Sequence, residues 1–171
     1  IRRRIRVVKS ISKITSAMKM VAAARLRKAQ DRALAARPYA QKLQHIVQDL
    51  AKGAGSVEHP LMQAREVNKA VFVIVGAERG LAGSYNTAIM NKAMHEIKKF
   101  EPENIKLILV GRKAAGFFKR LPYEVMLAIE MTGNDIGFPE INRMSTKLSD
   151  MFVSGEIDAV YMVYAKFVTA M

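Results

Sequence analysis

Residues 14–26 read ITSAMKMVAAARL, a stretch that contains no glycine, no proline and no acid. Alanine, leucine and methionine favour helices, and the stretch lies within residues 1–52, where glycine is absent. These residues therefore predict one long N-terminal helix. About fifty helical residues would extend roughly 75 Å, whereas a compact chain of this size has a radius of gyration of about 15–16 Å. We expect the helix to protrude from the rest of the molecule.

The same segment holds nearly all of the excess positive charge. The chain has 171 residues and a formal net charge of +13, and residues 1–52 contribute fourteen lysines and arginines against only Asp31 and Asp49. Solvated helices usually mix charges of both signs, because opposite charges three or four residues apart support each other. The first thirty residues contain no acid. This bias indicates an acidic partner, which could be nucleic acid, a membrane surface or an acidic protein.

The apolar positions of the predicted helix recur in alternating steps of four and three residues. This spacing is typical of a coiled-coil seam, and consecutive steps of four from Ile14 to Leu26 offset its two halves as a stutter does. Pro38 removes a backbone donor, so we expect a kink or a break there while the seam continues. The seam comprises Val7, Ile11, Ile14, Met18, Ala22, Leu26, Ala29, Ala33, Ala36, Ala40, Leu43, Val47 and Leu50.

The alanines of the seam favour a protein partner. Small side chains let two helices approach closely, whereas helices on a membrane surface usually bury leucine, phenylalanine or tryptophan. Helices that read DNA tend to carry their basic residues apart from the zipper that pairs them, but here the basic residues overlap the seam. A nucleic-acid-binding helix attached to an α/β domain stays open as an alternative. No apolar run approaches the roughly 20 residues that a membrane-spanning helix needs.

The second part of the chain alternates short apolar runs with helical stretches. Such alternation predicts an α/β fold, Rossmann-like, with a mainly parallel sheet and helices on both faces. Runs such as AVFVIV are wholly apolar and β-branched, as in strands buried on both sides. We expect strands at 70–75, 105–110, 124–130 and 159–165, and helices at 84–100, at 112–120, and from Pro139 to Gly155. We divide the chain into an N-terminal coiled-coil helix at 1–54, a linker at 55–68 and an α/β domain at 69–171.

The loop after the first predicted strand raises the question of a nucleotide. Its glycines follow G-x-x-x-G-x-x-G over residues 76–83, not the G-x-G-x-x-G of dinucleotide-binding folds, and no Gly-Lys-Ser/Thr follows. Arg112 and Lys113 follow the second strand where a ribose-binding acid would be expected. Because a basic pair could meet a 2′-phosphate, an NADP-dependent enzyme remains a second, weaker alternative.

Other signs of catalysis are weak. The chain contains no cysteine, and its three histidines, His45, His59 and His95, lack the spacing of metal ligands. No Ser/His/Asp order or carboxylate pair stands out. We therefore expect no catalytic residues, no metal and no cofactor in this chain.

Three stretches of the sequence resemble one protein family. IRRRIRVVKSISKITSAMKMVAAARLRKAQ at 1–30, ARPYA at 36–40 and GAERGLAGSYN at 76–86 closely resemble the gamma subunit of the F-type ATP synthase in its bacterial form. The resemblance runs through the whole chain to KFVTAM at 166–171. It is specific, because separate motifs occur in the family's order on the predicted helix and on the predicted strand-loop-helix.

The resemblance implies a rotor shaft. In this family the N-terminal helix winds antiparallel with a long C-terminal helix inside a ring of three alpha and three beta subunits, and the α/β domain lies at the base beside the epsilon subunit and the c-subunit ring. The chain would transmit torque between the proton-driven ring and the catalytic ring, without nucleic acid. It would be peripheral, at the cytoplasmic face of the bacterial plasma membrane, and would contact the membrane only through the complex. The family's C-terminal helix has no counterpart in these residues, so we expect the seam to need a second helix.

The resemblance also implies which residues meet the beta subunits. A shaft that turns inside a protein bore should be thin, and its charges should act at long range rather than through locked pairs. Ala82 stands where many members carry cysteine, so the loop offers no thiol chemistry. The implied contacts are Arg4, Lys9, Lys13, Met18, Lys19, Met20 and Arg25 on the helix, and Arg79, Gly80, Leu81, Ala82 and Gly83 in the loop.

Overall fold

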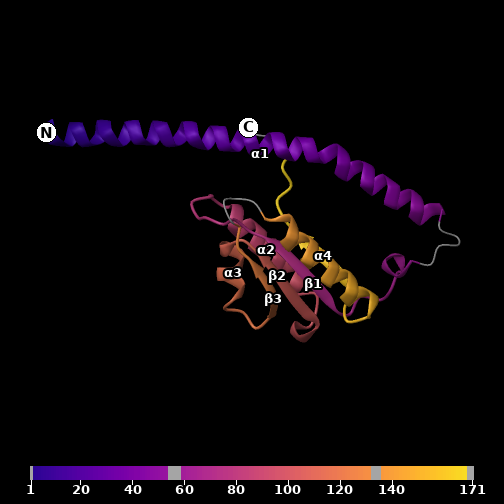
Figure 1. The fold of residues 1–171 in the computed structure, drawn as a ribbon. Helices are drawn as coiled ribbons and strands as arrows, with labels where there is room; N and C mark the ends of the chain where they lie inside the picture. Colours follow the sequence, from indigo (N-terminus) through magenta and orange to yellow (C-terminus); the bar gives the residue numbers. More distant parts are fainter. Residues whose placement is uncertain (1, 54–58, 132–135, 169–171) are drawn as a thin grey trace. The chain divides into compact units, whose positions relative to one another are not determined.

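A computed structural model of the chain describes residues 2–53, 59–131 and 136–168. The chain divides into two units, Ile1–Val57 and Glu58–Met171. The first consists of one long helix, and the second is an α/β domain (Figure 1).

The N-terminal unit is the helix α1, Arg2–Gly53, whose 52 residues extend for about 78 Å at ~1.5 Å per residue. It continues through Pro38 without a break, so of the two outcomes expected at this residue the structure excludes the break. Figure 1 shows that α1 bends over its C-terminal half, the half that contains Pro38. A proline lacks the donor for the carbonyl four residues earlier, which is an identifiable cause of bending in long helices.

The α/β domain is built on four parallel strands in the order β3-β2-β1-β4. Ala70 pairs with Ile105 and Val75 with Val110, while Val110 also pairs with Ile129, so the first three strands end level with one another. The strands are β1 (Ala70–Val75), β2 (Ile105–Val110), β3 (Glu124–Ile129) and β4 (Ala159–Val163), and the helices are α2 (Tyr85–Ile97), α3 (Arg112–Phe118), α4 (Phe138–Val153) and the short 3-10 turns η1 (Pro60–Met62) and η2 (Pro102–Asn104).

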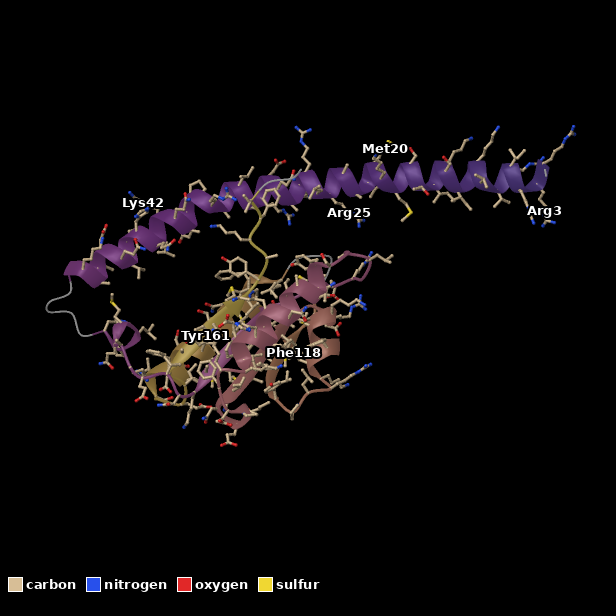
Figure 2. All side chains as sticks on the ribbon, turned by 180° about the vertical axis from the view of Figure 1, so that it is seen from behind. Arg3, Met20, Arg25, Lys42, Phe118 and Tyr161 are labelled. Carbon is tan, nitrogen blue, oxygen red and sulfur yellow. The ribbon has the colours of Figure 1, made fainter. Side chains whose placement is uncertain are left out.

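Alternate residues of the central strands bury themselves in two separate clusters. Phe72 and Ile74 of β1 pack with residues of α2 and α3, including Phe118. Val71 and Val73 point the other way and pack with Met151 of α4. Helices therefore cover both faces of a parallel sheet, which confirms the α/β fold class predicted from the alternating runs. Figure 2 labels Phe118 and Tyr161, two aromatic side chains of this domain.

The ends of α4 follow from local sequence signals. The helix begins one residue before Pro139, whose fixed φ suits a first turn. At its other end Gly155 adopts φ 77°, with its N–H donating to Phe152 O, and the N–H of Glu156 donates to Met151 O at 2.9 Å. This pair of bonds is the Schellman arrangement, in which glycine accepts a backbone conformation that costs other residues energy. The glycine predicted to close this helix does so.

Candidate functional site

The predicted seam lies entirely on α1, and all of its residues are exposed. The side chains of Ile14 and Met18, for example, are 57% and 66% exposed. An isolated helix draws little stability from its own backbone bonds, and most helices in proteins are stabilised by packing one apolar face. Since α1 is the one helix of the N-terminal unit within the described residues, no second helix of that unit covers its apolar positions there.

The basic residues implied as partner contacts surround α1 rather than sharing one side. Arg25 follows Ala22 by three residues and precedes Ala29 by four, so it lies on the seam side. Lys9 lies two residues from both Val7 and Ile11 and therefore faces the opposite direction. Lys13 lies two residues after Ile11 and one before Ile14, so it also points away from the seam. Figure 2 shows labelled side chains at Arg3, Met20, Arg25 and Lys42 projecting along the length of α1. A partner that encloses this helix would meet positive charge from several directions.

The loop between β1 and α2 begins with a firmly bonded neck at residues 76–78. The N–H of Gly76 donates to Val110 O at 2.9 Å, and the N–H of Lys113 donates to Ala77 O at 3.1 Å. Asn86 accepts the N–H of Ala77 on its side-chain oxygen at 3.0 Å, which links the start of the loop to the first turn of α2. These bonds hold both ends of the loop together.

Gly111 is the residue that lets the neck pack so closely. It adopts φ 87°, and a Cβ placed there would lie 2.6 Å from the carbonyl oxygen of Gly76. Only glycine allows both the positive φ and this approach of two backbones. The ends of β1 and β2 are therefore in direct main-chain contact.

Glu78 completes the neck with contacts to the residues that follow β2 and β3. One carboxylate oxygen accepts the main-chain N–H of Arg112 at 3.3 Å and that of Met131 at 3.1 Å. The other oxygen pairs with Nε of Arg112. The bond from Met131 first, and those from Arg112 with its charge, hold the pKa of Glu78 below its ordinary value despite partial desolvation.

The tip of the loop, Arg79–Gly83, is exposed throughout. Leu81 stands in the left-handed region at φ 61°, and its side chain is fully exposed to solvent. The basic side chain of Lys113 lies near the tip, because a Cβ placed on Gly80 would lie 3.4 Å from its Nζ. All five residues that the resemblance implied as loop contacts are thus gathered in one protruding turn.

The sequence singled out the tip of this loop as a predicted contact, but it did not single out Glu78 or Asn86. Asn86 lies nine residues after Ala77, whose N–H it accepts. An asparagine at the start of a helix is a recognisable signal, because its side chain often bonds to nearby backbone groups. The partners of Glu78 lie 34 and 53 residues away. The only clue in the sequence was that parallel strands end at the same edge of a sheet.

The geometry does not support a dinucleotide at this loop. Nucleotide-binding turns offer free backbone N–H groups to phosphate, but the N–H groups of Gly76 and Ala77 are already bonded within the protein. The Arg112 guanidinium, a candidate for a 2′-phosphate, is paired with Glu78. In the part of the chain that the structure describes, no group of three acidic, histidine or cysteine residues is placed to hold a metal ion.

No helix in residues 2–53, 59–131 and 136–168 is both long enough and apolar enough to cross a bilayer.

Comparison with known proteins gives matches over the whole chain. Residues 1–171 match the family model described as ATP synthase. The chain is 41% identical over 171 residues to the ATP synthase gamma chain of Heliobacterium modesticaldum, covering 100% of this chain and 58% of that protein. It is 39% identical over 170 residues to the gamma chain of Desulfitobacterium hafniense, with 99% and 60% covered. The gamma chain of Brevibacillus brevis is 37% identical over 172 residues, again with 99% and 60% covered. The chain thus spans about three fifths of the length of these curated relatives.

Proposed function

Because this chain belongs to the gamma-chain family of the ATP synthases, we propose that it supplies one helix and the base domain of a rotary motor's central stalk. In this role α1 is half of an antiparallel coiled coil, and the α/β domain receives torque from a proton-driven c ring. The rotor then drives conformational steps in the catalytic subunits around it, during ATP synthesis or hydrolysis. The chain itself performs no bond chemistry.

The observation that carries this proposal is the exposed seam of α1. Thirteen apolar residues with coiled-coil spacing are all exposed, and they need a second helix to bury them. Five of them, Ala22, Ala29, Ala33, Ala36 and Ala40, are alanines, which allow two helices to approach closely. A close pair of helices is a thin rod, and a thin rod suits a bore inside a ring of subunits.

The charge of α1 supports a protein bore rather than a simple solvated surface. Its basic residues lie on several sides, so acidic segments of surrounding beta subunits can attract it at every angle of rotation. Such attraction is long-range and screened by salt, and it does not require a fixed pair at one angle. We assign the contacts with the beta subunits to Arg4, Lys9, Lys13, Met18, Lys19, Met20 and Arg25 on α1, and to the loop tip Arg79–Gly83.

The remaining partners follow from the same role. The base domain would contact the epsilon subunit and the c ring, and the chain would reach the cytoplasmic face of the plasma membrane only through them. The nucleic-acid alternative has no observation in its favour beyond charge, and it does not account for alanines on a basic seam. The NADP alternative rested on the basic pair Arg112 and Lys113, and Nε of Arg112 is engaged by Glu78 rather than left for a phosphate.

A pull-down followed by native mass spectrometry tests the proposal. The protein is expressed from its native gene with an affinity tag, recovered from detergent-solubilised membranes, treated with nuclease and washed with salt to remove nonspecific polyanions. We expect one copy of this protein with three alpha and three beta subunits. A tagged, basic protein of unrelated fold serves as the control. Recovery of the protein alone, or with nucleic acid that resists the salt wash, would contradict the proposal.

A further inference from the structure

We propose that Glu78 is a positioning residue that joins the ends of three strands and thereby presents the loop tip Arg79–Gly83 to its protein partner in one conformation. The identity of that partner rests on the proposed function. The clamp itself rests on contacts within this chain.

The carboxylate of Glu78 bonds to elements that lie far apart in the sequence. Its Oε2 accepts both the N–H of Arg112, at the start of α3, at 3.3 Å and the N–H of Met131, just beyond β3, at 3.1 Å. Glu78 itself follows β1 by three residues. One side chain therefore ties together the segments that leave β1, β2 and β3.

The clamp acts at the last residue before the exposed tip. Gly76 and Ala77 are already held through Val110 O and Asn86, and the next residue, Arg79, is exposed. Within the described residues, Arg79 has no acidic partner. Glu78 is thus the last bonded residue of the neck before the exposed tip begins. A contact at this position has the largest effect on how the tip is oriented.

The conformation of the tip needs such support. Leu81 holds φ 61°, a region that non-glycine residues rarely adopt, and its fully exposed side chain gains no packing in return. A loop left free at its neck would relax to more favourable backbone angles. A tip that is ordered before binding also loses less conformational entropy when it meets a partner.

The arrangement differs from a simple ion pair. Two of the three contacts of Glu78 come from main-chain N–H groups, which only an acceptor side chain can satisfy. Exchanging the two side chains, as in E78R/R112E, would keep opposite charges but would present an arginine to two N–H donors. The exchange should therefore fail to restore the tip, whereas it would restore an ordinary ion pair.

Hydrogen exchange and proton pumping together test the proposal, using the protein from its native gene, alone and in its complex. We compare Glu78→Ala and the milder Glu78→Gln with Glu96→Gln, a control that also loses a paired glutamate but lies on α2, away from the loop. For Glu78→Ala we expect amide exchange at residues 79–84 to rise at least tenfold while β1 and β2 stay protected. Protons pumped per ATP hydrolysed should fall at least twofold. Glu78→Gln should show a smaller effect of the same kind, and the control should match the natural protein.

The possible results separate the clamp from the proposed function. Unchanged exchange at the tip in Glu78→Ala would overturn the clamp, as would rescue by E78R/R112E or an equal loss of protection in β1 and β2. Faster exchange at the tip with normal pumping would overturn the role of the tip in presenting a partner contact. If the natural protein forms no complex with alpha and beta subunits, the proposed function fails, and exchange in the protein alone still decides whether Glu78 is a clamp.

Discussion

At the scale of single residues, Gly111 offers the sharpest test of the loop neck. It stands at φ 87°, and a Cβ there would meet the carbonyl oxygen of Gly76 at 2.6 Å. Gly111→Ala should therefore lower the free energy of unfolding of the α/β domain by about 2 kcal/mol or more, through both strain and the clash. Urea denaturation followed by tyrosine fluorescence measures this loss.

Gly116 provides the matched control. It lies inside α3, where an added Cβ would have nothing within 4 Å. Because alanine has a higher helix propensity than glycine, Gly116→Ala should raise the free energy of unfolding by roughly 0.5–1 kcal/mol. If both substitutions lowered the free energy of unfolding by a similar amount, the close backbone approach would not be the reason that position 111 requires glycine.

Residue-level features could be predicted only where the signal was local. Gly155 was identified as a helix end because glycine after the last apolar position is a local signal. The place of Arg112 after a strand makes it a candidate phosphate ligand in the sequence, but the structure pairs it with Glu78. That pair spans 34 residues, so it depends on how the strands align and leaves no mark in the neighbouring sequence.

At the scale of elements, truncating a side chain to alanine should change the free energy of unfolding more on one side of α1 than on the other. Leu43 is a seam residue, and Leu34 lies on the opposite side of the helix, yet both are 50% exposed in this chain. If a second helix covers the seam, Leu43→Ala should cost about 2–3 kcal/mol of unfolding free energy in the protein from its native gene. Leu34→Ala should cost less than about 1 kcal/mol. Thermal unfolding followed by far-UV circular dichroism measures both, and equal losses would contradict the assigned seam.

The elements themselves were largely predictable from the sequence. The runs at 70–75 and 105–110 form strands with the predicted bounds, because continuous β-branched residues are stable only between two covered faces. Helix ends were less predictable. The helix expected at 112–120 ends at Phe118. Apolar periodicity locates the body of a helix more reliably than its last residue, because helix ends fray. The sequence does not distinguish a kink from a break at Pro38, because both arise from the same missing backbone donor.

At the scale of the whole α/β domain, stability should decrease in acid. Lys92 and then Lys99 hold the pKa of Glu96 at about 2, from an ordinary value of 4.5. Bonds from the backbone of Lys69 and Asn68 lower the pKa of Asp158, and its ordinary value is 3.8. Carboxyls with lowered pKa values stabilise the fold above their ordinary pKa and lose that contribution as the pH falls through the folded value.

The urea midpoint of the domain should therefore be nearly constant from about pH 8 to 5 and fall as the pH decreases from about 4.5 towards 2. Glu96→Gln removes one of these carboxyls, so its midpoint should fall less steeply over the same range. A midpoint that rises on acidification, or an unchanged slope in Glu96→Gln, would contradict this account of the charges.

We propose that this protein turns inside a ring of catalytic subunits, and single-molecule rotation tests this proposal most directly. Residues 1–171 contain no cysteine, so Glu103→Cys, at an exposed position in η2, provides an attachment point for a bead. The protein from its native gene is assembled with alpha and beta subunits, and the ring is fixed to a surface. We predict that ATP drives rotation of the bead in one direction, with one step for each beta subunit. A bead that stays fixed or only fluctuates while the complex hydrolyses ATP would show that this protein is not a rotor.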